Sequence, residues 1–253
     1  MNAAVRQAKI RQMLESNDFV DLETFCGELK TSESTIRRDL IALEQEGAVR
    51  RVYGGAMAAQ VPANSHALDY RHQSMRMQQE KMRIAMMAAD LVEDGQTVIL
   101  DGGSTVAGVA RELTAKSLHV MTNSLEIAEV FADARQIELT LTGGYLYPRL
   151  RAMVGPFCEH MLSTIRADVL IMGVAGVTAA GFSNNNTLVV GPERKMIEVS
   201  RRVIVVTDHS KFGRGAMIPI EPLDVADVVV TDTGLAPEYL DMLEASGVQV
   251  MLA

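Results

Sequence analysis

The chain has 253 residues, of which 48% are hydrophobic and 22% charged, a balance typical of a folded globular protein. Its formal net charge of −8 argues against a protein that coats nucleic acid without sequence preference, because such binding grows with the number of phosphates neutralised. The two cysteines, the absence of a signal-peptide pattern and the absence of an apolar run approaching about 18 residues predict a cytoplasmic protein with free thiols and no membrane partner.

Residues 1–57 carry the pattern of a small helical domain, in which apolar residues recur at helical spacing in three segments. They are Ala8, Met13 and Leu14 in the first segment, Leu22, Phe25, Cys26 and Leu29 in the second, and Ile36, Leu40 and Leu43 in the third. Ser32 stands before the third segment as a suitable N-cap. A basic hairpin around Arg50 and Arg51 follows, so we predict a winged helix-turn-helix domain whose third helix enters the major groove of DNA.

The polar face of the predicted third helix supplies candidate DNA contacts. Advancing about 100° per residue places Arg38 and Ser34 opposite the apolar stripe, with Thr35 and Arg37 on its flanks. A solvated helix face would explain a lone Arg-Arg pair as well, but the adjoining basic hairpin favours DNA. The predicted DNA-binding residues are Ser32, Ser34, Thr35, Arg37, Arg38, Arg50, Arg51 and Tyr53.

The run from Thr35 to Leu40, Thr-Ile-Arg-Arg-Asp-Leu, and the later Gly54-Gly55-Ala56 resemble the amino-terminal signature of the DeoR family of bacterial transcriptional regulators. The sequence departs from that pattern at Thr31, where an apolar residue is usual, and at Gly27, in a helix that normally lacks glycine. The resemblance implies binding to double-stranded operator DNA. Because dimers match palindromic half-sites, we also expect a homodimer or homotetramer.

After a predicted linker at residues 58–74, residues 75–253 alternate between strands and helices and predict a second domain. The expected strands are 97–100, 118–122, 137–142, 169–172, 203–206 and 228–230, and the expected helices are 75–91, 107–113, 125–132, 157–164, 193–200 and 237–245. The strands are almost continuously apolar. They therefore indicate an open, mostly parallel α/β sheet that is covered by helices on both faces.

Small and polar residues follow several of these strands, at the edge where such sheets bind ligands. Glycines there let backbone N–H groups approach a phosphate, and hydroxyls and a lysine add donors. Each Gly-Gly alone is explained by a tight turn, but the repeated placement favours an anion site. The predicted effector-binding residues are Asp101, Gly102, Gly103, Ser104, Thr105, Thr122, Asn123, Gly143, Gly144, Asp208 and Lys211.

Residues from about 79 to 232 also resemble the DeoR-family effector domain, which is similar in fold to ribose-5-phosphate isomerase and CoA transferases. This resemblance implies a phosphorylated sugar as effector. The Asp101–Thr105 loop, the Thr122-Asn123 pair, Asp208 and Lys211 match the positions that line the family's site. The stretch 181–186 is more individual, and we expect it to help select the sugar.

The leading hypothesis is a transcriptional regulator, a repressor of a sugar or carbohydrate-derivative operon, controlled by a phosphorylated sugar. A sugar-phosphate isomerase or deaminase with an appended DNA-binding domain is the rival, with Asp101, Asp208 and Lys211 as acid–base groups. A structural adaptor that binds neither DNA nor ligand is a third alternative. The five histidines are scattered without metal-ligand spacing, so we predict no catalytic residues, metal or cofactor.

Overall fold

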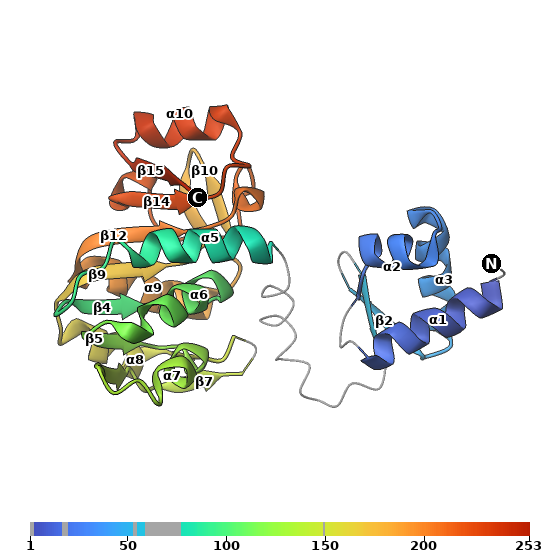
Figure 1. Ribbon diagram of the computed structural model, residues 1–253, viewed down its shortest axis with the longest axis horizontal. Helices are drawn as coiled ribbons and strands as arrows, with labels where there is room; N and C mark the ends of the chain where they lie inside the picture. The colour runs from blue at the N-terminus through green and yellow to red at the C-terminus, as the bar shows by residue number, and fades with distance from the viewer. Residues whose placement is uncertain (1–2, 17–19, 53–54, 59–76, 149) are drawn as a thin grey trace. The chain divides into compact units, whose positions relative to one another are not determined.

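The structure, a computed structural model, describes residues 3–16, 20–52, 55–58, 77–148 and 150–253 (Figure 1). The chain divides into two compact units, Met1–His72 and Gln73–Ala253, which we call the N-terminal and C-terminal units. Among the described residues, no helix combines the length and apolar character needed to cross a bilayer. Except for residue 58, which ends a strand, the predicted linker 58–74 falls outside the described residues.

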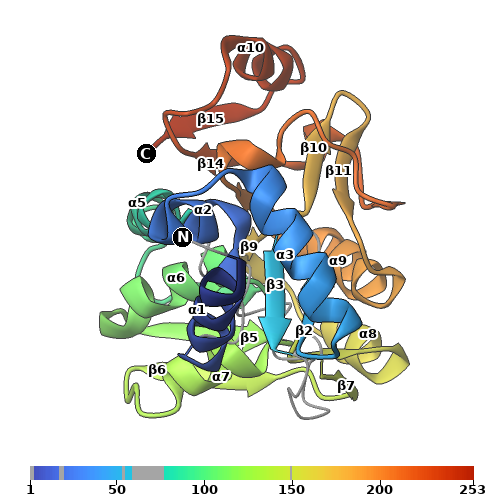
Figure 2. The same cartoon turned by 90° about the vertical axis from the view of Figure 1, so that its right-hand side faces the viewer.

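The described part of the N-terminal unit folds into three helices and a small antiparallel sheet (Figure 2). Its elements are α1 (Ala3–Ser16), β1 (Val20–Asp21), α2 (Leu22–Leu29), α3 (Glu33–Gln45), β2 (Val49–Val52) and β3 (Gly55–Ala58). β3 lies between β1 and β2 and pairs with both. The side chain of Asp21 caps α2 by accepting a 2.6 Å hydrogen bond from the N–H of Thr24. This arrangement confirms the predicted winged helix-turn-helix.

The core of the N-terminal unit forms where the apolar stripe of α3 meets the other two helices. Ile36, Leu40 and Leu43 are buried there together with Phe25, as the helical spacing predicts. Asp39 is also buried on α3, and it accepts hydrogen bonds from the guanidinium of Arg6 on α1. An ion pair therefore ties the first helix to the third beside the apolar contacts.

The C-terminal unit is built on a seven-stranded parallel sheet. Its strands are β4 (Thr97–Leu100), β5 (Leu118–Thr122), β6 (Ile137–Leu141), β9 (Ala167–Met172), β12 (Ser200–Val206), β14 (Val228–Thr231) and β15 (Gln249–Leu252), in the spatial order β15-β14-β12-β9-β4-β5-β6. The chain runs from β4 outward to β6 and then returns to β9 on the other side of β4. The strand order thus reverses between β4 and β9, the position at which open parallel sheets bind their ligands.

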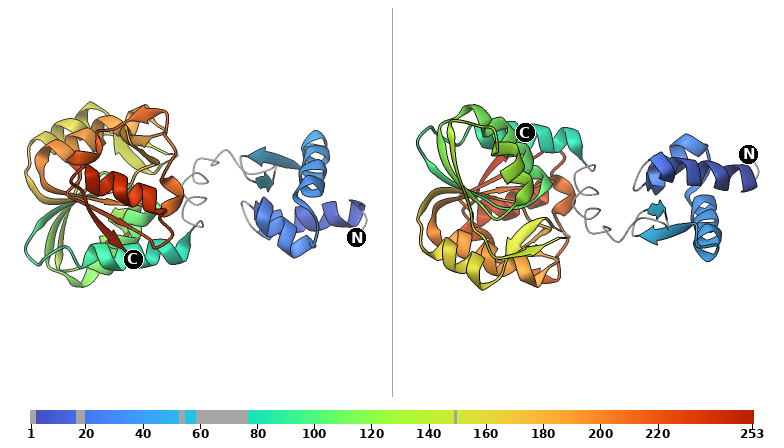
Figure 3. Two further views of the ribbon diagram at one scale, coloured as in Figure 1. Left: turned by 90° about the horizontal axis from the view of Figure 1, so that it is seen from above. Right: turned by 90° about the horizontal axis from the view of Figure 1, so that it is seen from below.

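Helices cover both faces of this sheet (Figure 3). α5 (Gln78–Ala89), α6 (Ser104–Glu112) and α7 (Leu125–Phe131) pack on one face, and α8 (Pro156–Ser163), α9 (Thr187–Val199) and α10 (Pro237–Ala245) pack on the other. Neighbouring strand residues alternate between the two cores: Val98 and Leu100 join the first, and Ile99 joins the second. The open, mostly parallel α/β fold predicted from the sequence is confirmed.

Short elements complete the unit. β7 (Tyr145–Tyr147) pairs with β8 (Ala152–Val154), and β11 (Gly181–Asn184) lies between β10 (Gly176–Thr178) and β13 (Ile218–Pro219). Three single-turn helices, η1 (Leu113–Ala115), η2 (His209–Lys211) and η3 (Leu223–Val225), also occur among the described residues.

Some predicted boundaries were wrong. The helix predicted at 107–113 begins at Ser104, directly after Gly103, whose φ of 126° takes the chain from strand to helix. The helix predicted at 193–200 begins at Thr187, although Gly191 and Pro192 are typical of a helix break. Its first turn is stabilised by Asn186, whose side chain accepts a 2.9 Å hydrogen bond from the N–H of Leu188.

Candidate functional site

The first candidate site is the exposed face of α3. Ser34, Arg37 and Arg38 are exposed on this helix, opposite its buried stripe. Ser32 occupies the N-cap position, but its hydroxyl does not bond a backbone N–H; it lies 3.1 Å from the hydroxyl of Ser34 and 2.9 Å from that of Thr35. The start of α3 therefore presents a cluster of short hydroxyl side chains beside two arginines.

The arginines of this unit differ in their ion pairing. Arg37 is held by Glu33, one helical turn earlier, at 2.8 Å between Nε and Oε1. Arg51 on β2 pairs with Glu44, with 2.6 Å between Nε and Oε2, and this contact lowers the pKa of the Glu44 carboxyl. Arg38 is exposed and has no ion pair among the described residues. It is thus the arginine most open to an outside anion on the described part of α3.

Two predicted DNA contacts cannot be placed. Arg50 lies in β2 opposite Met57, but the structure does not describe its side chain. Tyr53 falls outside the described residues.

The second candidate site lies at the carboxyl ends of the sheet strands. Leu100 pairs with Thr122 and with Ile171, and Thr122 pairs with Leu141, so the loops that follow β4, β5, β6 and β9 start side by side. The loop after β12 lies next to that of β9. The predicted effector residues thus come from loops that leave one edge of the sheet, with the Asp101 loop beside the point of strand reversal.

Asp101 is a buried acid at this edge with a strongly raised pKa. Its side chain is buried, and burial raises its pKa to about 7, although hydrogen bonds from the backbone N–H groups of Gly102 and Gly173 act in the opposite direction. The following residues lead into α6, where the hydroxyl of Ser104 accepts a 3.0 Å hydrogen bond from Nζ of Lys81 on α5. The buried acid is thus followed by a helix N-terminus whose first hydroxyl is contacted by a lysine.

The next two loops contribute mostly to structure. Thr122 is buried, donates to the carbonyl of Leu100 at 2.6 Å and accepts from the N–H of Ser124. Gly143 and Gly144 have φ values of 66° and 111°, and a Cβ on Gly144 would lie 2.8 Å from the carbonyl oxygen of Val154. The glycine pair is therefore explained by its turn and by close packing.

Asn123 differs from its neighbours in this loop because part of its side chain is unused. Its Nδ2 donates to the carbonyl of Met153 at 3.2 Å. Its Oδ1 is buried and has no hydrogen-bond partner among the described residues.

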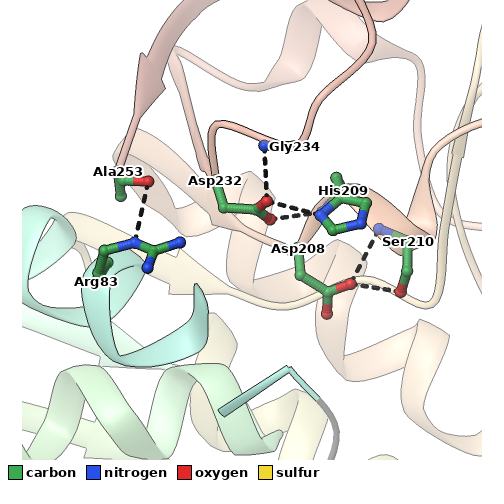
Figure 4. A network of polar contacts seen from close by, with 7 residues as sticks. All are labelled: Arg83, Asp208, His209, Ser210, Asp232, Gly234 and Ala253. Atoms are coloured by element: carbon green, nitrogen blue, oxygen red, sulfur yellow. Dashed lines mark hydrogen bonds and ion pairs between the residues drawn. The ribbon is translucent and has the colours of Figure 1, made fainter. Parts of the chain in front are cut away.

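The loop after β12 is a polar network, drawn in Figure 4. Asp208 is buried and accepts from the backbone N–H of Ser210 at 3.0 Å and from its hydroxyl. The ring of His209 lies 2.6 Å from Asp232, which also accepts from the N–H groups of His209 and Gly234. Burial alone raises the pKa of Asp232, but these hydrogen bonds together lower it. Lys211 follows at the end of η2, partly exposed and without an ion pair among the described residues.

Sequence patterns missed two polar residues near this edge, Lys81 and Glu193, whereas Asn184 belongs to the stretch 181–186 that was expected to help select the sugar. Lys81 reaches Ser104 from a helix, whereas Glu193 comes from α9 and Asn184 from β11. The amide of Asn184 donates to Oε1 of Glu193 at 2.6 Å, and Oε2 of Glu193 is buried without a partner among the described residues. Burial, and next the charge of Asp101, raise the pKa of Glu193 well above its usual range.

Comparison with known families matches both units. Residues 6–60 match the DeoR-like helix-turn-helix domain, and residues 76–233 match the DeoR C terminal sensor domain. The chain belongs to the DeoR family of transcriptional regulators. This assignment confirms the predicted regulator, which binds operator DNA, and rejects the rival enzyme hypothesis.

Similar full-length proteins support the assignment. The HTH-type transcriptional repressor GlcR of Bacillus subtilis is 32% identical, with 98% of this chain and 95% of that protein covered. A putative aga operon transcriptional repressor of Escherichia coli O157:H7 is 33% identical, with coverage of 98% and 93%. The glycerol-3-phosphate regulon repressor of Escherichia coli K12 is 30% identical over the whole length of both chains. The DeoR-family regulator described here thus resembles these repressors along nearly its whole length.

Proposed function

We propose that this DeoR-family regulator represses an operon for the use of a sugar or sugar derivative, and that a phosphorylated sugar controls it. The names of its relatives, which include repressors of an aga operon and of a glycerol-3-phosphate regulon, support the repressor role. The observation that carries the sensing role is the sheet edge at the strand reversal, where the N-terminus of α6 follows a buried acid and its Ser104 hydroxyl is contacted by Lys81. A regulator with these two roles acts in the cytoplasm.

In the DNA complex, Arg38 and its hydroxyl neighbours Ser34 and Thr35 read base edges, whereas Arg50, Arg51 and Tyr53 hold phosphates. Arg38 suits this role because it is exposed and, among described residues, not ion-paired. Arg38→Ala therefore weakens binding to a duplex selected from the source genome by about 1–3 kcal/mol in a gel-shift titration.

Lys9→Ala is the matched control for Arg38→Ala, because it removes an exposed positive charge from α1. It leaves specific binding nearly unchanged. Unchanged binding by Arg38→Ala would remove this residue from the base-reading set, and an equal loss on unrelated duplexes would reassign it to phosphate contact.

In the sensor unit, the phosphate lies against the Gly102–Thr105 loop at the α6 N-terminus, with Lys211 as a facing cation. A thermal-shift screen of phosphorylated sugars against their unphosphorylated counterparts tests this assignment. Only phosphorylated members are expected to raise the melting temperature. Lys211→Ala abolishes the effect while DNA affinity survives, and Arg135→Ala, which removes an exposed charge elsewhere, retains it.

The effector acts by changing how often the DNA-binding units occupy each of their relative poses. A homodimer or homotetramer engages two half-sites only in some relative poses of its DNA-binding units. A phosphorylated sugar that binds the other poses more tightly releases the operator. Equal sugar affinity in the presence and absence of operator would contradict this coupling.

A further inference from the structure

Two buried acids lie together where the strand order reverses. Asp101 follows β4 and accepts from the N–H groups of Gly102 and Gly173. Glu193 projects from α9, which packs on the face of the sheet opposite to α6. Each is at least 95% buried, with 5% and 2% of its surface exposed, and the charge of Asp101 acts directly on Glu193. Two like charges at close range in a buried setting are unfavourable unless a proton or a cation lies with them.

Among the described residues at this edge of the sheet, two side-chain acceptors lack a hydrogen-bond partner, as do the hydroxyls of Thr207 and Thr231. Oε2 of Glu193 and Oδ1 of Asn123 are buried, and neither has a hydrogen-bond partner among the described residues. The amide of Asn123 is oriented by the bond from its Nδ2 to Met153, so its oxygen is the free end. Asn123 also follows β5 in register with Asp101 after β4. Buried acceptors that lack donors are costly, and they indicate a ligand that supplies donors.

The number of donors and the charge that a ligand group offers decide which kind of group fits these atoms. A hydroxyl group offers one donor and no charge, whereas an ammonium group offers three donors and a positive charge. A divalent metal ion is a weaker fit, because the described residues contain no group of three His, Cys, Asp or Glu side chains placed to hold one. An ammonium group supplies both the positive charge that the acidic pair requires and the donors that the two unpartnered oxygens lack.

We propose that the effector of this regulator is an aminated sugar phosphate, whose ammonium group lies between Asp101 and Glu193 while its phosphate lies at the α6 N-terminus. The inference rests on the proposed function, since it assigns the other end of the same ligand. Asn184 holds Oε1 of Glu193 and so leaves Oε2 directed to the amine. Asn184 belongs to the 181–186 stretch, which thereby contributes to the choice of sugar through Glu193.

Calorimetric titration of the full-length protein tests the proposal. The ligands are glucosamine 6-phosphate and galactosamine 6-phosphate, each compared with its N-acetylated form and with the hexose 6-phosphate that carries a hydroxyl at the same carbon. At least one amine is expected to bind about tenfold or more tightly than both counterparts, because they lack the charge-assisted bonds. Equal or tighter binding by the hydroxyl or N-acetyl sugars overturns the proposal.

The variant Glu193→Gln keeps the size of the side chain and removes its charge, so the preference for the amine is expected to fall to threefold or less. Glu244→Gln, at an exposed position on α10, is the matched control and retains the preference. A preference that persists in Glu193→Gln overturns the role of Glu193. The wild-type comparison remains decisive where the variant fails to fold. If no phosphorylated sugar of any kind binds, the proposed function fails as well, and this outcome is distinct from equal binding of aminated and hydroxyl sugars.

Discussion

The two units handle polar side chains in opposite ways. The N-terminal unit displays its candidate DNA contacts on the surface, where Glu33 and Glu44 pair with Arg37 and Arg51 in contact with water. The C-terminal unit buries several of its candidate effector contacts, including Asp101, Asn123 and Asp208, and burial raises the pKa of Asp101. Surface charges can be altered at little cost in stability, whereas buried ones couple ligand binding to the stability of the fold.

The largest effect should come from breaking the core of one unit while leaving the other intact. Phe25 on α2 is fully buried in the N-terminal core, and Phe25→Ala is expected to destabilise that unit by about 3–5 kcal/mol. Differential scanning calorimetry should show the corresponding transition lowered or lost, with the transition of the C-terminal unit unchanged. Phe157→Ala, at a position that is 80% exposed on α8, is the control and should have little effect. A shift of all transitions together would show that the units unfold as one.

The pH dependence of the C-terminal unit should reveal its buried acid. The pKa of Asp101 is about 7 in the folded state and near 3.8 when unfolded, so between these values the folded chain holds a proton that the unfolded chain releases. Stability should therefore fall as the pH rises from about 4 to about 7, by up to about 4 kcal/mol. Asp232, with its pKa lowered, acts with the opposite sign and only at more acidic pH.

Asp101→Asn removes one of the two buried acids with a raised pKa and should make this pH profile shallower, measured by urea unfolding at several pH values, while Glu193 still contributes with the same sign. The exposed Asp241→Asn should leave the profile as it is. A wild-type stability that rises between pH 5 and 7 would contradict the raised pKa of Asp101.

The sequence predicts the framework better than the contacts within it. The helix at 237–245 and the strands at 97–100 and 118–122 have the bounds that the patterns predict, because a continuous apolar or helical period marks them. The β10–β11 hairpin and β15 were not predicted, because β11 reads Gly-Phe-Ser-Asn and β15 is a short run after Gly247. Local periodicity carries little information on such short or polar strands.

The candidate site shows the same limit. The loop residues Asp101, Asn123 and Asp208 could be named because they directly follow predicted strands, and parallel strands bring their carboxyl ends to one edge. Lys81 and Glu193 could not, since each lies on a helix and reaches the edge only through packing that sequence spacing does not encode. Their positions become apparent only when α5 and α9 are placed on the two faces of the sheet.

A smaller effect is expected at Gly27, on the exposed face of α2. A Cβ at this position would have no atom within 4 Å, and Gly27 does not have a positive φ. Gly27→Ala should therefore stabilise the N-terminal unit by about 0.5–1 kcal/mol, because alanine loses less backbone entropy in a helix. Chemical denaturation measures the change. A loss of stability would show that the glycine has a packing role that the structure does not contain.

The smallest effect on stability, with a separate effect on DNA, is expected at Glu44. Its ion pair with Arg51 is partly exposed, so Glu44→Gln should change the stability of the N-terminal unit by less than about 0.5 kcal/mol. The same change removes a negative charge next to the hairpin and releases Arg51, so binding to a nonspecific duplex at low salt should tighten about two- to fivefold. The slope of log K against log salt should steepen by up to the amount expected for about one additional phosphate contact. Glu28→Gln removes an exposed charge from α2 and is the control. If Glu44→Gln instead weakens binding, the ion pair holds Arg51 in place for a phosphate, and the surface of this unit is as preorganised as the interior of the other.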